Sequence, residues 1–172
     1  MLQEHRENER ASVKCSVMTV SDTRTKETDK SGKLIIQLLE AEGHRITHYD
    51  IVRDEKRLIQ EMVKGVTIRQ DVDVVLINGG TGISERDVTI EAIQPLFTKE
   101  IPGFGELFRM LSYQSDIGSA SMLSRATAGV MNNRIVFSTP GSPKAVQLAM
   151  EKLILPELGH VLKEVTKDID EK

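Results

Sequence analysis

A chain of 172 residues is long enough for one domain that buries roughly two-thirds of its unfolded surface. Its 39% hydrophobic and 28% charged residues are typical of globular proteins, and a net charge of −3 without any Trp argues against a nucleic-acid-binding surface. No apolar stretch is as long as a membrane span and no signal-peptide pattern opens the chain, so we expect a cytoplasmic protein without nucleic-acid or membrane partners.

Strand and helix patterns alternate along the first half of the chain. The apolar run at 13–20 predicts a strand, residues 31–43 predict a helix, and residues 44–52 a second strand. Residues 55–69 predict an amphipathic helix, and the run VDVVLIN at 72–78 predicts a fully buried strand.

The alternation continues with more helix in the second half. We expect helices over 88–97 and 104–114, a last strand at 134–140, and a closing helix over 143–158 that Pro156 interrupts. Strands that alternate with helices pair in parallel through right-handed crossovers. The sequence therefore predicts an α/β fold, a three-layer αβα sandwich with a mostly parallel central sheet.

The domain organisation is simple, because the sequence contains no internal repeat and no long linker. We expect residues 12–166 to form one domain, with a flexible N-terminal tail at 1–11 and a C-terminal tail at 167–172.

Cysteine and histidine give little support for a metal site. Cys15 is the only cysteine, and its apolar neighbours favour an inert buried thiol. His44 and His48 are four residues apart, a spacing that suits metal ligands on a helix. The β-branched segment around them favours a strand, on which they would lie about 13 Å apart, so we do not expect them to bind a metal.

Polar residues gather behind the predicted strands. The segments at 21–32, 53–55, 78–87 and 138–143 hold most of the Ser, Thr, Gly and Asp clusters, whereas the turns at the other ends of the strands are plain. Ligands bind open parallel sheets at the carboxyl ends of their strands. We therefore expect these four segments to form the functional edge.

The most informative of these segments is INGGTGISERDVT at 77–89. Gly79, Gly80 and Gly82 can adopt positive φ and let backbone amides approach an anion, and the following helix start adds its positive end. The loop is neither a P-loop nor a G-x-G-x-x-G motif. A generic glycine-rich turn is the alternative, but the buried strand before it and the helix behind it favour a phosphate-binding loop.

Two aspartates accompany this loop at the predicted edge. Asp54 and Asp87 each directly precede a helix, so each alone is best explained as a helix N-cap. Together they could hold Mg²⁺ against nucleotide phosphates. Arg86 suits either a phosphate contact or a solvated surface charge.

The last segments also allow two explanations. Ser142 and Pro143 are typical of a helix start, yet the backbone there and Lys144 would also suit an anion. The helix at 104–114 places Leu107, Phe108 and Leu111 on one face, and we expect Met110, Met122 and Met131 to serve packing. The small residues around Arg125 permit close approach of a ligand or of another subunit.

Taken together, the motifs resemble a known family. NGGTGISERDVT, PGFGELFRMLS, SRATAG and STPGSPKAV, with SD at 21–22 and DKSG at 29–32, are similar to the molybdenum cofactor biosynthesis protein B and molybdopterin adenylyltransferase family, which includes the gephyrin G domain. The resemblance covers residues 12–160. It implies a three-layer αβα fold, a trimer or hexamer, and adenylylation of the terminal phosphate of molybdopterin by Mg-ATP with release of pyrophosphate.

The resemblance also implies roles for individual residues. Catalysis and Mg²⁺ binding fall to Asp54 and Asp87. The positions implied to bind nucleotide or phosphate are Gly79, Gly80, Thr81, Gly82, Glu106, Pro140 and Gly141. The positions implied to bind the pterin and its phosphate are Ser21, Asp22, Ser112, Ser124, Arg125, Ser142 and Lys144.

Two other functions are compatible with these motifs. A non-catalytic molybdopterin-binding or scaffold homologue would bind pterin tightly without turning over ATP. A nucleotide pyrophosphatase related through the GGTG loop would hydrolyse a dinucleotide without pterin, and PGFGELFRMLS argues against it. The apolar, small-residue stretch 107–131 predicts a homo-oligomer, because one small domain would not cover it fully.

Overall fold

The computed structural model describes residues 12–169, so the expected tail at 1–11 lies outside the described residues. Six strands are present: β1 (Lys14–Val20), β2 (Arg45–Val52), β3 (Val74–Asn78), β4 (Lys99–Glu100), β5 (Thr127–Met131) and β6 (Arg134–Thr139). The α-helices are α2 (Lys30–Ala41), α3 (Lys56–Thr67), α4 (Thr89–Ile93), α5 (Pro102–Ser115), α6 (Pro143–Ala149) and α7 (Leu155–Thr166). Short 3₁₀ segments follow α4 and α5, at Gln94–Leu96 and Gly118–Leu123. No helix among these residues is long and apolar enough to cross a bilayer.

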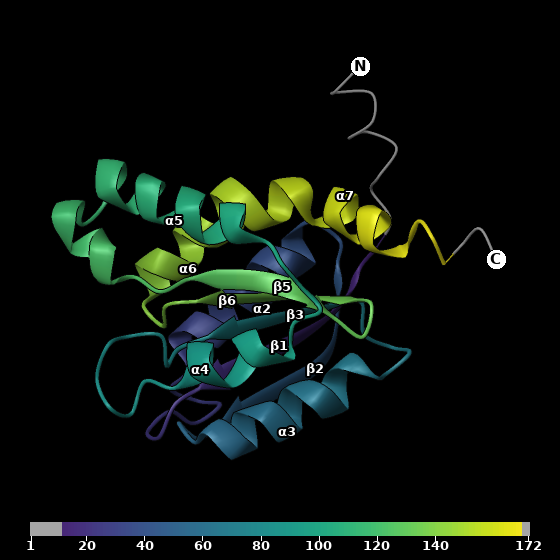
Figure 1. Ribbon diagram of the computed structural model, residues 1–172, viewed down its shortest axis with the longest axis horizontal. Coiled ribbons are helices and arrows are strands. Elements are labelled where there is room, and N and C mark those ends of the chain that lie inside the picture. Colours follow the sequence, from purple (N-terminus) through teal and green to yellow (C-terminus); the bar gives the residue numbers. More distant parts are fainter. Residues whose placement is uncertain (1–11, 170–172) are drawn as a thin grey trace.

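All six strands belong to one sheet, in the order β2-β1-β3-β6-β5-β4. The first four in this order are parallel, and β5 and β4 continue the sheet in antiparallel pairing. Helices α5, α6 and α7 cover one face with α2, and α3 and α4 cover the other (Figure 1). The predicted three-layer αβα sandwich with a mostly parallel sheet is confirmed.

Alternation along the central strand β3 builds the two cores. Val74 and Leu76 pack on the α2 and α5 side, while Val75 and Ile77 pack on the α3 and α4 side. All residues of β3 are buried, as the continuous apolar run predicts for a strand covered on both faces. Because β3 lies between β1 and β6, the loop that follows β3 begins at the middle of the sheet.

Sequence analysis missed β4 and β5. β5 joins β6 through Asn132 and Asn133, whose φ values of 50° and 57° form a two-residue hairpin turn. The residues of β5 lack the β-branched alternation of a typical strand, and Gly129 is required because a Cβ would lie 2.3 Å from the Phe97 ring. The antiparallel strands at this edge agree with the expected mostly parallel sheet, but the hairpin itself was not predicted.

Two helices also differ from expectation. α5 buries Phe104, Phe108 and Ser112, whereas Leu107 is 46% exposed, so Leu107 and Phe108 do not share one face as expected. The closing helix runs through Pro156 without a break, because a π turn at Met150–Ile154 connects α6 to α7. Proline lacks an amide donor, and the wider turn lets the chain pass it while remaining helical.

The three methionines that were expected to serve packing, Met110, Met122 and Met131, divide between core and surface. Met131 is buried, as expected for packing. Met110 and Met122 are 47% and 79% exposed, so the packing interpretation was wrong for them within this chain. They lie on α5 and the 3₁₀ segment behind it, together with other exposed apolar residues.

Candidate functional site

The centre of the candidate site is a turn of two glycines at the end of β3. Gly79 and Gly80 have φ values of 93° and 67°, in the left-handed region that favours glycine. A Cβ on Gly79 would lie 2.3 Å from the carbonyl oxygen of Val20, so the turn packs directly against the end of β1. Thr89 fixes the turn from the other side, since its hydroxyl donates to the Gly79 oxygen at 2.9 Å and its amide to the Gly80 oxygen at 3.0 Å.

Asp54 lies against this turn although it follows a different strand, β2. A Cβ on Gly80 would lie 3.0 Å from Asp54 Oδ1. The amide of Asp54 donates to Asp22 Oδ1 at 3.1 Å, and no side chain of residues 12–169 donates a hydrogen bond to its carboxylate. The N-cap of α3 is Glu55, so the helix-cap interpretation of Asp54 was wrong. Asp54 and Thr81, the residue after Gly80, thus lie on the same rim of the sheet.

Asp87 closes the loop that follows the glycine turn. Its Oδ2 accepts from the Ser84 amide at 3.1 Å and from the Ser84 hydroxyl at 2.6 Å. A Cβ on Gly82 would lie 2.5 Å from the same oxygen, so glycine leaves room for the carboxylate. The N-cap of α4 is Val88, and the helix-cap interpretation was wrong here as well.

Three aspartates set the charge at this rim together with Arg86 and with Arg53, whose Nε lies 3.9 Å from Asp22 Oδ1. Arg86 binds Asp22, with Nη2 2.7 Å from Oδ2, and this hydrogen bond lowers the pKa of Asp22. Burial raises the pKa of Asp54, and the nearby charges of Asp22 and Asp87 raise it further. The rim therefore carries more carboxylate charge than Arg86 and Arg53 neutralise, an environment that favours a bound cation.

Arg125 connects the glycine loop to the segment that precedes β5. Its Nε donates to the Thr81 oxygen at 2.9 Å and its Nη2 to the Asp87 oxygen at 3.2 Å. Both of its Nη atoms also bind the carboxylate of Glu91 on α4. This bond lowers the pKa of Glu91, so the pair is ionised at neutral pH.

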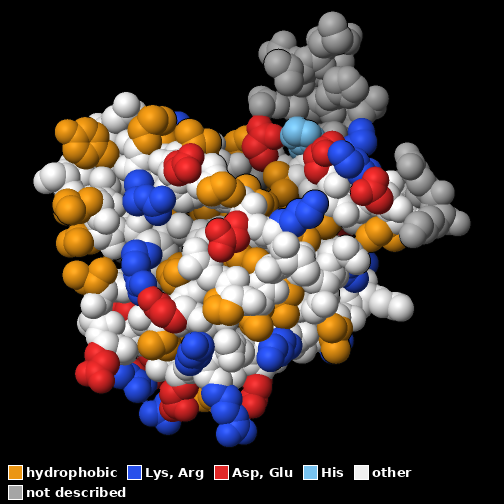
Figure 2. All heavy atoms as spheres, viewed as in Figure 1, with side chains coloured by type: hydrophobic (Ala, Val, Ile, Leu, Met, Phe, Trp, Pro, Cys, Tyr) orange, Lys and Arg blue, Asp and Glu red, His pale blue; other side chains and the backbone are white. Residues whose placement is uncertain are grey.

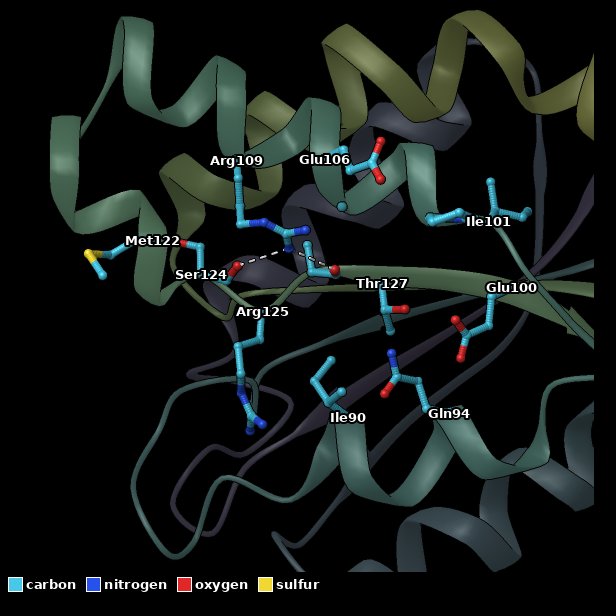
Figure 3. Close-up of a pocket in the computed structure, with 13 residues that line it drawn as sticks. Ile90, Gln94, Glu100, Ile101, Glu106, Arg109, Met122, Ser124, Arg125 and Thr127 are labelled. Carbon is cyan, nitrogen blue, oxygen red and sulfur yellow. Dashed lines mark hydrogen bonds between the residues drawn. The ribbon is translucent and has the colours of Figure 1, made fainter.

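A pocket of about 480 Å³ opens beside Arg125, between α4 and α5 (Figure 3). Its polar lining includes Glu106 and Arg109 from α5 and Ser124 from the segment before β5. Arg109 braces this segment, since its Nη1 donates to the carbonyl oxygens of Ser124 and Ala126 at 3.4 Å each. The volume of this pocket lies in the range of roughly 300–1,000 Å³ that is usual for small-molecule sites.

A second pocket, of about 120 Å³, lies on the other side of the glycine turn. Gly79, Gly141, Ser21 and Ser31 are among the residues that line it. A Cβ on Gly141 would lie 3.1 Å from the Gly79 Cα, and the Ser31 hydroxyl donates to the Gly141 oxygen at 2.7 Å. The loops behind β1, β3 and β6 therefore meet at this small pocket.

A buried carboxylate organises the floor of the small pocket. Asp29 is 1% exposed, and its Oδ2 accepts from the hydroxyls of Thr19 and Tyr49 at 2.6 Å each. Its Oδ1 accepts from the Gly32 amide at 2.9 Å and so caps α2. Burial and this contact with Asp29 raise the pKa of Tyr49. Asn78 extends the network by donating to Thr19 Oγ1 at 2.9 Å.

Cys15, His44 and His48 take no part in the site. Burial raises the pKa of Cys15 to about 12, so its thiol is protonated at neutral pH. His44 Nδ1 accepts from the Val13 amide at 3.3 Å, and His48 Nε2 lies 3.1 Å from Asp71 Oδ2. Within residues 12–169, no group of three or more His, Cys, Asp or Glu side chains is arranged to hold a metal ion.

Comparison with known proteins identifies the family. The family described as "Probable molybdopterin binding domain" matches residues 16–160. The chain belongs to this family. It is 62% identical over 167 residues to the molybdenum cofactor biosynthesis protein B of Bacillus subtilis (strain 168), a match that covers 97% of this chain and 98% of that protein.

Solved structures of the family share the fold. A crystal structure of a molybdenum cofactor biosynthesis protein B matches with a TM-score of 0.90 at 58% identity, and covers 92% of this chain and 98% of its own. The tungsten cofactor synthesizing protein MoaB from Pyrococcus furiosus matches with a TM-score of 0.79 at 43% identity, with coverages of 90% and 97%. The family resemblance recognised in the sequence motifs is confirmed.

The structure groups most, but not all, of the residues to which the resemblance assigns roles. Ser21, Gly79 and Gly141 line the small pocket, with Pro140 directly before Gly141 in the chain. Asp22, Asp54, Gly80, Thr81, Gly82 and Asp87 form or touch the glycine loop. Glu106, Ser124 and Arg125 line the large pocket.

Four of the implied pterin-binding residues line neither pocket. Asp22 instead binds Arg86 at the rim. Ser112 is buried on α5. Ser142 caps α6 by accepting from the Ala145 amide at 3.2 Å, which confirms its structural explanation. Lys144 lies 3.3 Å from Asp116 at a separate hollow.

Sequence analysis missed the roles of Asp29, Tyr49 and Glu91. The spacing of Asp29 and Gly32 is that of an N-cap and could have identified the cap. No local pattern identifies Tyr49 or Glu91, because their partners lie 20 and 34 residues away in sequence.

Replacing Tyr49 by Phe tests the buried Asp29 network. The variant removes one donor to a buried carboxylate, so the free energy of unfolding should fall by about 1–2 kcal/mol. Urea unfolding measures the loss. Tyr113→Phe is the matched control. Tyr113 is 61% exposed, so the loss of its hydroxyl should change the free energy of unfolding little. Equal stability of both variants would contradict the importance of this contact.

Asp54→Asn tests the charge at the rim. A carboxyl with a raised pKa in the folded state stabilises the fold at low pH and loses this contribution as the pH rises through the raised pKa. Without Mg²⁺ at pH 8, the Asn variant should therefore unfold at the same or a higher temperature than the wild type. The advantage should vanish below the ordinary pKa of 3.8. If Asp54→Asn were less stable than the wild type at pH 8 and equally stable at low pH, the raised pKa of Asp54 would be refuted.

Proposed function

We propose that this chain binds molybdopterin and transfers the adenylyl group of Mg-ATP to its terminal phosphate, with release of pyrophosphate. The observation that carries the proposal is the contact of Asp54, from one strand end, with the positive-φ glycine turn of another. The family and the names of its members support the cofactor pathway. The adenylyl transfer is inferred from the site and from the motif resemblance.

The glycine turn suits a phosphate. Positive φ at Gly79 and Gly80 turns the backbone at the rim, and the missing side chains let this turn pack directly against Val20 and Thr89. Thr89 holds the carbonyls of Gly79 and Gly80, so the turn is preorganised before any ligand arrives.

The carboxylates of Asp54 and Asp87 fit Mg²⁺ bound together with phosphates. Mg²⁺ is usually held by one or two protein carboxylates, while waters and substrate phosphates complete its octahedral shell, so a cluster of three protein ligands is not required. Burial raises the pKa of Asp54 most, and the charges of Asp22 and Asp87, which a divalent cation would neutralise, raise it further. When bound, the metal supplies charge neutralisation for the α-phosphate and the leaving pyrophosphate.

The protein contributes positioning and charge to the transfer. An oxygen of the pterin phosphate forms a bond to the α-phosphorus of ATP, and the bond between that phosphorus and the bridging oxygen to pyrophosphate breaks. Such transfers depend on holding both phosphates in line rather than on covalent catalysis by a side chain. We assign this task to the glycine turn, with Asp54 and Asp87 as the catalytic, metal-holding pair.

The two pockets suit the two parts of the ligands. The larger one, with Glu106 and Ser124 at its wall, has the volume for a ring system and is proposed to take the pterin or the adenosine. The smaller one, at about 120 Å³ beside Gly79 and Gly141, suits a phosphate-sized group. The glycine turn lies between the larger and the smaller pocket.

Release of pyrophosphate from ATP tests the proposed reaction. The wild type should release it only when both Mg²⁺ and molybdopterin are present. Asp87→Asn should lower kcat by on the order of 10²-fold or more while the fold persists, because a charge at the reacting phosphates is lost. Asp168→Asn, beyond the end of α7, is the control and should retain full activity.

Three experimental results would each contradict part of the proposed function. Tight pterin binding by calorimetry without pyrophosphate release would identify a non-catalytic pterin-binding protein. Hydrolysis of a dinucleotide without pterin would identify a pyrophosphatase. Normal turnover by Asp87→Asn would limit Asp87 to closing its own loop.

We further propose a trimer or hexamer of this chain. Apolar side chains gather over α5 and the 3₁₀ segment behind it (Figure 2). The exposed members of this surface are Leu107, Met110, Tyr113, Ile117, Met122 and Leu123. Several large apolar side chains exposed on one surface are typical of a protein–protein interface.

Light scattering of the full chain tests the oligomer. The mass should be three or six times the chain mass of 19.2 kDa. Leu107→Asp should shift the mass toward the monomer, because a charge on this surface cannot be buried without a partner. Ile68→Asp is the control, because Ile68 follows the last residue of α3 and is 71% exposed; it should leave the mass unchanged. A monomeric wild type at assay concentration would refute the oligomer.

A further inference from the structure

The loop that carries Asp87 is tied together at its base. Residues 82–86 extend from the glycine turn, and Ile83 within them is 69% exposed. The residues on either side, Thr81 and Asp87, both offer their carbonyl oxygens to Arg125. One guanidinium therefore joins the two ends of this loop.

Arg125 is itself held by Glu91. Both Nη atoms of Arg125 bind the Glu91 carboxylate, in the two-point geometry that suits an arginine and a carboxylate. The oxygens of Thr81, Asp87 and Glu91 occupy four of the five N–H donors of the guanidinium. Among the described contacts, one donor is left, too few for the two-point grip that an arginine needs on a phosphate.

We propose that Glu91 and Arg125 form a clamp that positions the Asp87 carboxylate, so that Arg125 is a positioning residue. The inference rests on the proposed metal-holding role of Asp87. It gives Arg125 a different task from the pterin contact that the motif resemblance implies. The clamp fixes the loop ends, and the bond from Ser84 to Asp87 then fixes the carboxylate within the loop.

The geometry favours the clamp over a purely local role for Glu91. A glutamate in the first turn of a helix stabilises that helix through its dipole whichever way it points. Glu91 instead contacts a guanidinium 34 residues away, and that guanidinium reaches two carbonyls outside α4. A local role predicts effects within α4, whereas the clamp predicts effects in the Asp87 loop.

Amide hydrogen exchange of the full chain, measured without ligands, tests the clamp. The reporters are the amides of Ser84 and Asp87, which bond within the loop. Glu91→Gln should speed their exchange by about two- to fivefold, the factor expected for a half-exposed ion pair. Glu61→Gln breaks a comparable pair, in which Arg57 Nε lies 2.8 Å from Glu61, and should leave the loop unchanged.

Steady-state kinetics of pyrophosphate release give a readout that general loss of stability would not move. Glu91→Gln and Arg125→Lys should both raise the Mg²⁺ concentration for half-maximal activity, while KM for molybdopterin stays constant. Lysine keeps the charge of Arg125 but cannot reach Thr81, Asp87 and Glu91 at once. A higher KM for molybdopterin in Arg125→Lys, with a constant Mg²⁺ requirement, would overturn the clamp and restore the pterin contact.

The two measurements separate this inference from the proposed function. If the wild type releases no pyrophosphate, faster exchange in Glu91→Gln still supports the clamp, and the adenylyl transfer alone fails. Unchanged exchange of Ser84 and Asp87 in Glu91→Gln would overturn the clamp whatever the activity. Thermal unfolding of each variant confirms that the fold is retained.

Discussion

The close packing of the Gly79–Gly80 turn is the constraint on which the rest of the site depends. The turn fits between the end of β1, the carboxylate of Asp54 and the hydroxyl of Thr89, and none of these contacts leaves room for a Cβ. Positive φ at both residues then follows from the need to reverse the chain within this space. Because the turn is this tight, the loops behind three strands converge at one rim.

The site combines fixed backbone with unbalanced charge. Hydrogen bonds from Thr89 and Arg125 hold the carbonyls on the protein side of the loop. The carboxylates of Asp22, Asp54 and Asp87 gather near the guanidinium of Arg86, which binds Asp22, and near that of Arg53, which lies 3.9 Å from Asp22. Charged groups that are held in place in this way lower the reorganisation needed when charged ligands bind.

The parts that sequence predicted are those with a local physical signature. The buried run of β3 and the glycines after it mark the rim, and the rule that ligands meet the carboxyl ends of parallel strands brings Asp54 there. β5 could not be predicted from its residues, because its place depends on a hairpin with β6 and on Gly129 packing against Phe97. The roles of Tyr49 and Glu91 depend on which elements become neighbours, and no spacing within the chain encodes that.

One contact links the site to assembly of the whole sheet. The amide of Gly79 donates to the carbonyl of Thr139 at the end of β6, so strands from both halves of the chain must be docked before the turn closes. A partly folded chain that lacks β6 therefore has no complete rim to offer. By mass action, any ligand of the rim stabilises only the complete native state, and its concentration raises the resistance of the entire domain to unfolding.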